Sequence, residues 1–175
     1  MNKLFFFCLF FLFACKPVVK NIVQADACTN PAVNELIDSC AVSIPNIFTP
    51  NGDGINDVFL PVIACELDVF SMKVQDGDKV LFSSDDIGQA SWNGTFEEEV
   101  YLGFLSYTIG GVFKDSGTAF SFEGFVASVP YDITGQTNRD VYELENCEAC
   151  VFADQLTGVG VLNPTNEPQD FLCED

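Results

Sequence analysis

Two short segments of this chain carry side chains whose types and spacing could do chemistry. Cys147 and Cys150 have the C-x-x-C spacing of a dithiol oxidoreductase. Residues 51–57 read NGDGIND and hold four oxygen-bearing side chains, Asn51, Asp53, Asn56 and Asp57. Histidine is absent from all 175 residues. The sequence therefore excludes Ser-His and Cys-His dyads, His-ligated zinc and the commonest general base at neutral pH.

The acidic surroundings of Cys147 and Cys150 disfavour redox catalysis. A reactive thiol in such a motif needs a lowered pKa, usually from the N-terminus of a helix. Here Glu143, Glu145 and Glu148 lie close to the pair in sequence, and their negative charge would raise the thiol pKa. A four-Cys zinc site would need a second C-x-x-C motif, which the chain lacks. We therefore interpret both cysteines as disulfide candidates.

The segment 51–57 admits two interpretations. Hard oxygen ligands at alternating positions suit Ca²⁺, which makes calcium the candidate cofactor and Asn51, Asp53, Asn56 and Asp57 its candidate ligands. The segment is not an EF-hand, because the twelfth position counted from Asn51 is Val62, where a bidentate Glu is required. The other interpretation is a turn held by Asx side-chain hydrogen bonds to its own backbone. We expect the turn, with calcium as the alternative.

Charge and composition limit the classes of partner. The chain has 26 acidic and 7 basic residues and a formal net charge of −19. Nucleic acid is excluded as a partner, because a polyanion is repelled and no basic stripe can release its counterions. The hydrophobic fraction of 48% is too high for a disordered acidic tail, so an ordered core is expected. With no histidine and no clear catalytic spacing, we predict that the protein is not an enzyme.

The first 14 residues have the character of a signal peptide. Their apolar run of ten residues would reach about 15 Å as a helix, half of the hydrocarbon core of a membrane. Residues 12–15, Leu-Phe-Ala-Cys, resemble a bacterial lipoprotein signal, which implies cleavage before Cys15 and lipid on its sulfur. Ordinary secretory cleavage near Ala14 or Ala25 is the alternative. The resemblance predicts a lipid anchor in the outer membrane, with the membrane face left open.

Six further cysteines are disulfide candidates in an exported protein, namely Cys28, Cys40, Cys65, Cys147, Cys150 and Cys173. Asn30 and Pro31, followed by AVNELIDS, predict a short helix with Asn30 as its N-cap and Pro31 at its first position. Cys28 and Cys40 bracket this helix, so we expect them to be paired. Residues 15–43 are thus interpreted as a lipidated tether with a short helix.

Residues 44–129 have the pattern of an all-β domain. Phe70, Met72 and Val74 alternate on one face of a predicted strand, and Asp76 and Gly77 form a turn signal after it. Four strands are expected, at residues 67–74, 79–82, 100–113 and 118–129. These short strands and their turn signals predict a small β-sandwich. In the last strand the apolar phase changes at Glu123 and Gly124, which predicts a one-residue bulge.

Residues 44–59, IPNIFTPNGDGINDVF, resemble the opening signature of the gliding-motility-associated C-terminal domain, the type B sorting domain of type IX secretion. The resemblance continues through residues 72–82 and through Trp92-Asn93-Gly94-Thr95, and it covers about half the chain. It implies an immunoglobulin-like sandwich over residues 44–129. The turn QDGD at residues 75–78 departs from the family's aromatic-Asn-Arg-Trp-Gly turn. Exported cargo carries this domain at its end, whereas residues 130–175 follow it here, so a recruited binding module is expected.

Residues 130–175 are expected to be an irregular extension. They are rich in Asn, Pro, Gly and Gln and have little periodicity. We expect disulfide bonds, and not a core, to hold this extension against the sandwich.

The family resemblance and the predicted lipid anchor together predict a non-enzymatic subunit of a cell-envelope assembly of the gliding-motility or type IX secretion kind. We expect this subunit to bind other envelope proteins. The alternative is a surface ligand-binding module for calcium-dependent glycan recognition or adhesion. Sugar binding usually needs exposed aromatic rings, for which the candidates besides Phe are Trp92, Tyr101, Tyr107, Tyr131 and Tyr142. We expect Trp92 to be a core residue and Glu97-Glu98-Glu99 to be a solvated loop.

Overall fold

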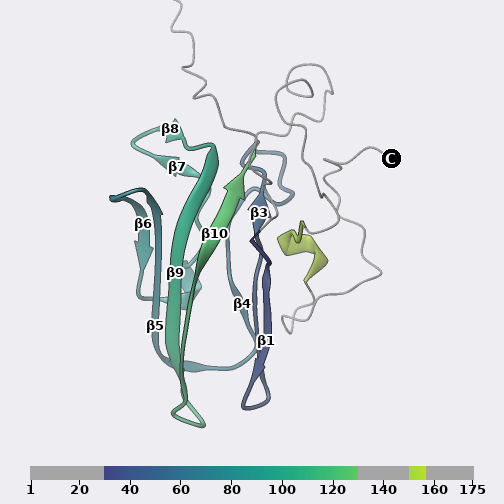
Figure 1. The fold of residues 1–175 in the computed structure, drawn as a ribbon, viewed down its shortest axis with the longest axis vertical. Coiled ribbons are helices and arrows are strands. Elements are labelled where there is room, and N and C mark those ends of the chain that lie inside the picture. The colour runs from purple at the N-terminus through teal and green to yellow at the C-terminus, as the bar shows by residue number, and fades with distance from the viewer. Residues whose placement is uncertain (1–29, 130–149, 157–175) are drawn as a thin grey trace, which may run out of the picture.

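Strands make up almost all of the regular structure. The computed structural model describes residues 30–129 and 150–156, and Figure 1 draws them in colour. The strands are β1 (Val33–Ile37), β2 (Cys40–Ile44), β3 (Ile47–Phe48), β4 (Val62–Ile63), β5 (Leu67–Asp76), β6 (Lys79–Ser84), β7 (Thr95–Phe96), β8 (Glu99–Val100), β9 (Gly103–Phe113) and β10 (Ala119–Ser128). The described residues also contain two 3-10 turns, η1 (Ile87–Gln89) and η3 (Ala153–Gln155). Neither range contains an α-helix, which confirms the all-β prediction for this part of the chain.

The strands form two sheets and one small hairpin. The larger sheet has the order β3-β10-β9-β5-β6, the smaller one β1-β2-β4, and β7 pairs with β8. β3 runs parallel to β10, and the other neighbouring strands are antiparallel. The long strands β5, β9 and β10 run the length of the domain, and the β1–β2 and β9–β10 turns lie at the same end of it (Figure 1).

The β5–β6 hairpin forms as its sequence predicts. Phe70, Met72 and Val74 are buried and alternate with exposed residues along β5, because successive side chains of a strand point to opposite faces. Gly77 lies in the turn with a φ of +58°, a left-handed conformation that glycine adopts at no steric cost.

The predicted helix after Asn30 is wrong. Val33–Ile37 is strand β1, which pairs along its whole length with β2. Asp38 and Ser39 form the turn between the two strands, both with positive φ (48° and 71°), as a type I′ hairpin turn requires. Pairing with the buried strand β2 outweighs the capping signals, because so short a segment is not a stable helix by itself.

The predicted bulge at Glu123 and Gly124 is also wrong. β10 pairs with β9 along its whole length without a register shift. Gly124 lies opposite Tyr107, and a Cβ atom on Gly124 would come within 2.6 Å of the Tyr107 hydroxyl oxygen. The glycine therefore permits close approach of the Tyr107 ring, which is the other use of a strand glycine.

The change of apolar phase along β10 has a different cause. Phe120 and Val126 face the main core, whereas Ala127 belongs to a second apolar cluster on the opposite face. Both faces of the strand are covered near its end, so apolar side chains occur in both phases there. Phe125 also lies in the second phase and is 47% exposed.

The main core lies between the two sheets and contains residues of both, such as Val42 of β2 and Ile109 of β9. Three aromatic contacts lie at its centre, Phe48 with Phe59 at 6.1 Å, Phe48 with Trp92 at 5.7 Å, and Phe59 with Tyr107 at 5.4 Å between ring centroids. Trp92 is 2% exposed, which confirms it as a core residue. The residues that carry the family resemblance, Phe48, Phe59 and Trp92, are thus packed in the interior.

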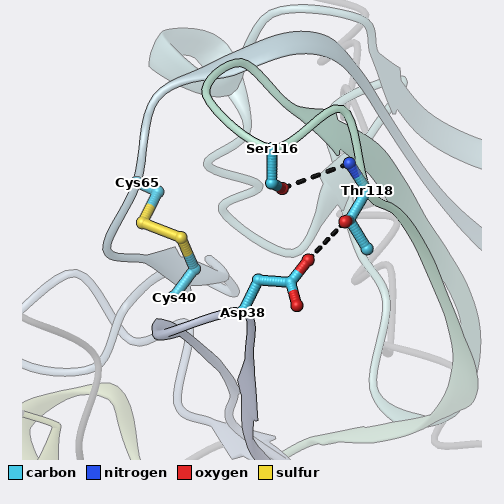
Figure 2. The surroundings of a disulfide bond; sticks show 5 residues. All are labelled: Asp38, Cys40, Cys65, Ser116 and Thr118. Carbon is cyan, nitrogen blue, oxygen red and sulfur yellow. Dashed lines mark hydrogen bonds between the residues drawn. A yellow bond between two sulfur atoms is a disulfide. The ribbon is translucent and has the colours of Figure 1, made fainter.

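The disulfide of Cys40 is formed with Cys65, 25 residues later. The predicted pairing of Cys28 with Cys40 is therefore wrong, since Cys40 begins a strand of the smaller sheet and β4 brings the following Cys65 beside it. Figure 2 shows this bond beside the Asp38 carboxylate, which accepts a hydrogen bond from the hydroxyl of Thr118. The bond between Asp38 and Thr118 ties the β1–β2 turn to the β9–β10 turn.

An ion pair adds to the same end of the domain. Lys114 Nζ lies 2.6 Å from Glu66 Oε2, and the Lys114 amide donates to the Glu66 carbonyl at 3.0 Å. The hydrogen bond and charge of Lys114 lower the pKa of the Glu66 carboxyl. Both side chains are largely exposed, so water screens the pair. The disulfide is the strong tie at this end.

Candidate functional site

The candidate site is the junction where residues 150–156 lie against the domain. Phe152 is 2% exposed and packs in a second apolar cluster with Ile47, Ala127, Val129 and Cys150, joined by the partly buried Phe104. This cluster lies on the face of the larger sheet opposite to the main core. The prediction that a disulfide bond holds the extension is confirmed at Cys150, but the prediction that no core does so is wrong for these residues, because Phe152 packs in this cluster.

Asn46 is the polar centre of this junction and is 1% exposed. Its Oδ1 accepts the N–H of Val151 at 2.7 Å, and its Nδ2 donates to the carbonyl of Asn30 at 2.9 Å. Its own amide donates to the Val151 carbonyl at 3.2 Å, and its carbonyl accepts the N–H of Ala127 at 2.8 Å. The side chain of Asn46 thus joins the N-terminal side of the domain to the extension, and its backbone carbonyl adds a bond to the last strand.

Asn56 makes the second polar link to the extension. Its Oδ1 accepts the N–H of Asp154 at 3.1 Å. The residue is buried, and its backbone has a positive φ of +49°. An open cavity of about 460 Å³ lies beside this contact, lined by Gly54, Ile55, Asn56, Asp57, Val58, Ala153 and Asp154. Asn56, one of the predicted calcium ligands, therefore binds the protein backbone.

The loop before Asn56 has the geometry of an Asx-stabilised turn. Asp57 Oδ1 accepts the amides of Asn51 and Gly52 at 3.0 and 2.5 Å, and Asp57 Oδ2 accepts the amide of Gly54 at 2.6 Å. Both carboxylate oxygens of Asp57 are therefore engaged by the loop's own backbone. Gly52 and Gly54 have φ of +82° and +90°, which lets their amides converge on the carboxylate.

Asp53 and Asn51 complete the same network. Asp53 Oδ1 accepts the amide of Ile55 at 2.8 Å, Asp53 Oδ2 accepts from Asn51 Nδ2 at 2.9 Å, and Asn51 Oδ1 accepts the Asp53 amide at 3.0 Å. These bonds support the turn interpretation. In the described ranges no three Asp, Glu, His or Cys side chains gather as a metal-binding group. Calcium at residues 51–57 stays a prediction.

The aromatic candidates for glycan binding lie in different places. Trp92 and Tyr107 are buried, and burial raises the pKa of Tyr107 to about 12. Tyr101 packs edge-to-face on Phe96 at 6.1 Å. Lys79 Nζ lies over both rings, 4.3 Å from the Phe96 centroid and 5.0 Å from the Tyr101 centroid, and donates to the Tyr101 hydroxyl at 2.5 Å. These two rings are thus engaged by a cation of the chain itself.

Glu97, Glu98 and Glu99 are exposed, as predicted. Glu97 and Glu98 form the turn of the β7–β8 hairpin, with φ of 51° and 68°. The hydrogen bond from Lys79 to Tyr101, more than the charges of Glu97 and Glu99, raises the pKa of the Lys79 ammonium. This acidic turn is a solvated feature of the surface.

The remaining predicted residues are Cys15, Cys28, Cys147 and Cys173 with Tyr131 and Tyr142, and all of them lie outside the described residues. Cys150 is disulfide-bonded, as Cys40 and Cys65 are. Three of the six disulfide candidates are therefore confirmed.

Sequence reasoning missed the roles of Asn46 and Phe152. A signal for Asn46 was its position between Pro45 and an apolar stretch, where a polar side chain would be buried and need partners. Phe152 lies two residues after Cys150 in a region that lacks periodicity. Only the fold shows that Ile47 and Ala127 leave an apolar surface for it.

Comparison with known proteins assigns no family to the chain. No family model, curated protein or solved structure was found to match the chain. Within the described residues, no helix is long and apolar enough to cross a membrane.

Proposed function

We propose that this protein is a lipid-anchored outer-membrane protein that acts as a non-enzymatic binding subunit of a cell-envelope assembly of the gliding-motility or type IX secretion kind. The observation that carries the proposal is the convergence at Asn46 of the chain near Asn30 and the extension at Val151. A lipid on Cys15 would hold this end of the domain near the membrane. Asn30 lies 15 residues after Cys15 in sequence, and that length of chain spans at most about 54 Å when extended.

The opposite end of the domain would then project from the membrane. It contains the β1–β2 and β9–β10 turns (Figure 1), which the hydrogen bond from Thr118 to Asp38 joins, and the Cys40–Cys65 disulfide lies beside them. A tethered domain with a stiffened far end suits docking to a larger assembly. The chain's charge of −19 favours a partner with a basic surface.

We also propose that the domain has an immunoglobulin-like fold. In the larger sheet, β10, β9 and β5 lie side by side in the order of strands G, F and C of immunoglobulin domains. β6 extends this sheet beyond β5, as an additional strand does in variable-type domains. Phe48, Phe59 and Trp92, which carry the family resemblance, are interior residues, and this supports a fold like that of the family. The proposal does not include the family's sorting role.

The alternative of a calcium-dependent glycan or adhesion module has less support. Trp92 is interior, and Lys79 occupies the faces of Phe96 and Tyr101. Asn56 and Asp57, two of the proposed ligands, hold the backbone of the extension and of the loop. Ca²⁺ would therefore have to displace hydrogen bonds that already stabilise the structure.

The lipid anchor is tested by mass spectrometry of the N-terminus of the protein from native membranes. We expect the first residue to be an acylated Cys15, and C15S to leave the protein in the soluble fraction. An unmodified N-terminus at another residue would refute the anchor.

The binding role is tested by purifying the tagged protein from gently solubilised membranes and identifying what accompanies it. We expect the same envelope proteins in repeated purifications, with recovery falling as salt screens the acidic surface. E97Q/E98Q and E35Q/D115N remove equal charge from opposite ends of the domain and show which end the partner contacts. Recovery of the wild-type protein alone would refute the assembly role.

A further inference from the structure

The outer face of the larger sheet points away from the main core, and no described element covers it between residues 150–156 and the β9–β10 turn. It is formed by alternate residues of β10, β9 and β5. β9 lies in the middle, with β10 on one side and β5 on the other (Figure 1). Residues 150–156, the described part of the extension, pack against the end of this face at Ala127 and Phe104.

Apolar and small residues cover much of this outer face. Val69 of β5 is 57% exposed and Phe125 of β10 is 47% exposed, the two large apolar side chains of the face that are most open to water. Between them lie small residues, among them Ser71, Gly110 and Ser121. Side chains of this size let a second flat surface approach closely.

The strand register places related residues at mirrored positions across β9. Thr108 is paired with Glu123 on one side and with Lys73 on the other. Gly110 is flanked in the same way by Ser121 and Ser71, and Val112 by Ala119 and Val69. Each of these three rows therefore has a matched pair of side chains on the two sides of β9. The first row has opposite charges, the second has two hydroxyls, and the third has two apolar side chains.

We propose that this face binds the same face of a second copy of the chain, around a two-fold axis that runs along β9. Such an axis places β10 of one copy over β5 of the other at the same level. Glu123 then faces Lys73 of the second copy, twice in the dimer, because a two-fold interface is self-complementary. Val112 meets its own copy at the axis, and Val69 meets Ala119.

The charges of the face support this occupant. Lys73 and Glu123 are exposed, and neither forms an ion pair within the described ranges. They are separated by β9, so each is better placed for a partner above the sheet. Two chains of net charge −19 repel one another at long range, so a self-contact needs local complementarity of this kind. Residues 150–156 pack at the other end of the face, near Ala127 and Phe104, so the contact lies in the rows near the β9–β10 turn.

Charge reversal tests the pairing, with sedimentation velocity of the full chain in detergent as the measurement. K73E and E123K each place like charges together twice, and we expect each to weaken the dimer by about tenfold or more. The double variant K73E/E123K restores opposite charges and the wild-type net charge, so we expect it to dimerise like the wild type. E35K changes the charge of an exposed residue of β1 as E123K does and should leave dimerisation nearly unchanged.

Cysteine cross-linking tests the axis independently. Thr108 faces Thr108 of the second copy, so T108C should give a disulfide-linked dimer on a non-reducing gel. Ser83 of β6 is the matched control, since it continues the row through Lys73 but lies away from the axis. A monomeric wild-type chain at tens of micromolar would overturn the proposal. So would a dimer that K73E/E123K fails to restore or that T108C fails to cross-link.

Discussion

Asn46 and Val151 are 105 residues apart in sequence and are joined by a 2.7 Å hydrogen bond from the Val151 amide to Asn46 Oδ1. The same asparagine also donates to the Asn30 carbonyl. A buried amide side chain in this position satisfies backbone groups of two separate segments. The domain and its extension are therefore linked by an interior contact as well as by an apolar cluster.

N46A should destabilise this junction more than an ordinary surface substitution. The change leaves the Val151 amide and the Asn30 carbonyl without their partner, at about 1–3 kcal/mol for each group that stays buried. Urea unfolding and limited proteolysis of the full chain measure the loss. N93A is the control, because Asn93 is exposed and, among the residues that the structure describes, its side chain bonds to nearby Thr95 alone. Equal effects of N46A and N93A would contradict a special role for Asn46.

F152A should detach residues 150–156 from the sheet. Removal of a fully buried Phe costs about 3–5 kcal/mol in a packed core, and this cluster is small, so the loss is expected as local opening. Hydrogen exchange should show faster exchange of the Val151 and Asp154 amides while β9 and β10 stay protected. F125A removes a half-exposed Phe from the same face of the sheet and should leave those amides unchanged. Loss of protection throughout the domain would instead make the extension part of the main folding unit.

Loss of the disulfide between Cys40 and Cys65 should destabilise the whole domain. The bond closes a loop of 25 residues, for which chain entropy gives about 3 kcal/mol of stabilisation. C40A/C65A is the specific test, because a reducing agent would also break the bond of Cys150. The free energy of unfolding in urea measures the effect. A value equal to that of the wild type would show that the ties at Asp38 and Glu66 suffice.

Stability should fall between pH 10 and pH 12 because of Tyr107. Burial raises its pKa from 10.0 to about 12. In this window the unfolded state releases the phenolic proton while the folded state keeps it, so the free energy of unfolding falls by about 1.4 kcal/mol for each pH unit.

Y107F removes this titration and should have a flatter pH profile. Lys79 and Lys114, whose pKa values are raised by their partners Tyr101 and Glu66, also lose stabilising contacts as the pH rises. They are present in both proteins, so the difference between the two profiles isolates Tyr107. Parallel profiles would contradict burial of its hydroxyl.

Calcium should have little effect on the stability of the folded chain. Asp57 accepts amides of Asn51, Gly52 and Gly54, and Ca²⁺ would have to break these bonds. We expect the same Tm in millimolar Ca²⁺ and in a chelator, and a lower Tm for D57A in both. A Tm that rises with Ca²⁺ in the wild type and stays constant in D57A would establish the calcium site.

Local sequence determined the features that depend on neighbouring residues. Alternation of Phe70, Met72 and Val74 defined the buried face of β5, and the Gly77 turn defined its hairpin with β6. The spacing of Asn51, Asp53 and Asp57 was sufficient to predict a self-bonded turn, because those hydrogen bonds span at most six residues. The acidic composition and the absence of histidine likewise limited the function before any fold was known.

Tertiary structure decided the features that depend on distant partners. Val33–Ile37 follows the helix-capping signals of Asn30 and Pro31 and becomes a strand because β2 lies beside it. Gly124 is explained by the Tyr107 ring opposite, and Cys40 pairs with Cys65 because β2 and β4 bring them together. Phe152 and Asn46 have their roles only once β3 and β10 have formed a surface for the extension. A one-dimensional pattern records which face of a strand is apolar, but the identity of the group that covers that face is set only by packing.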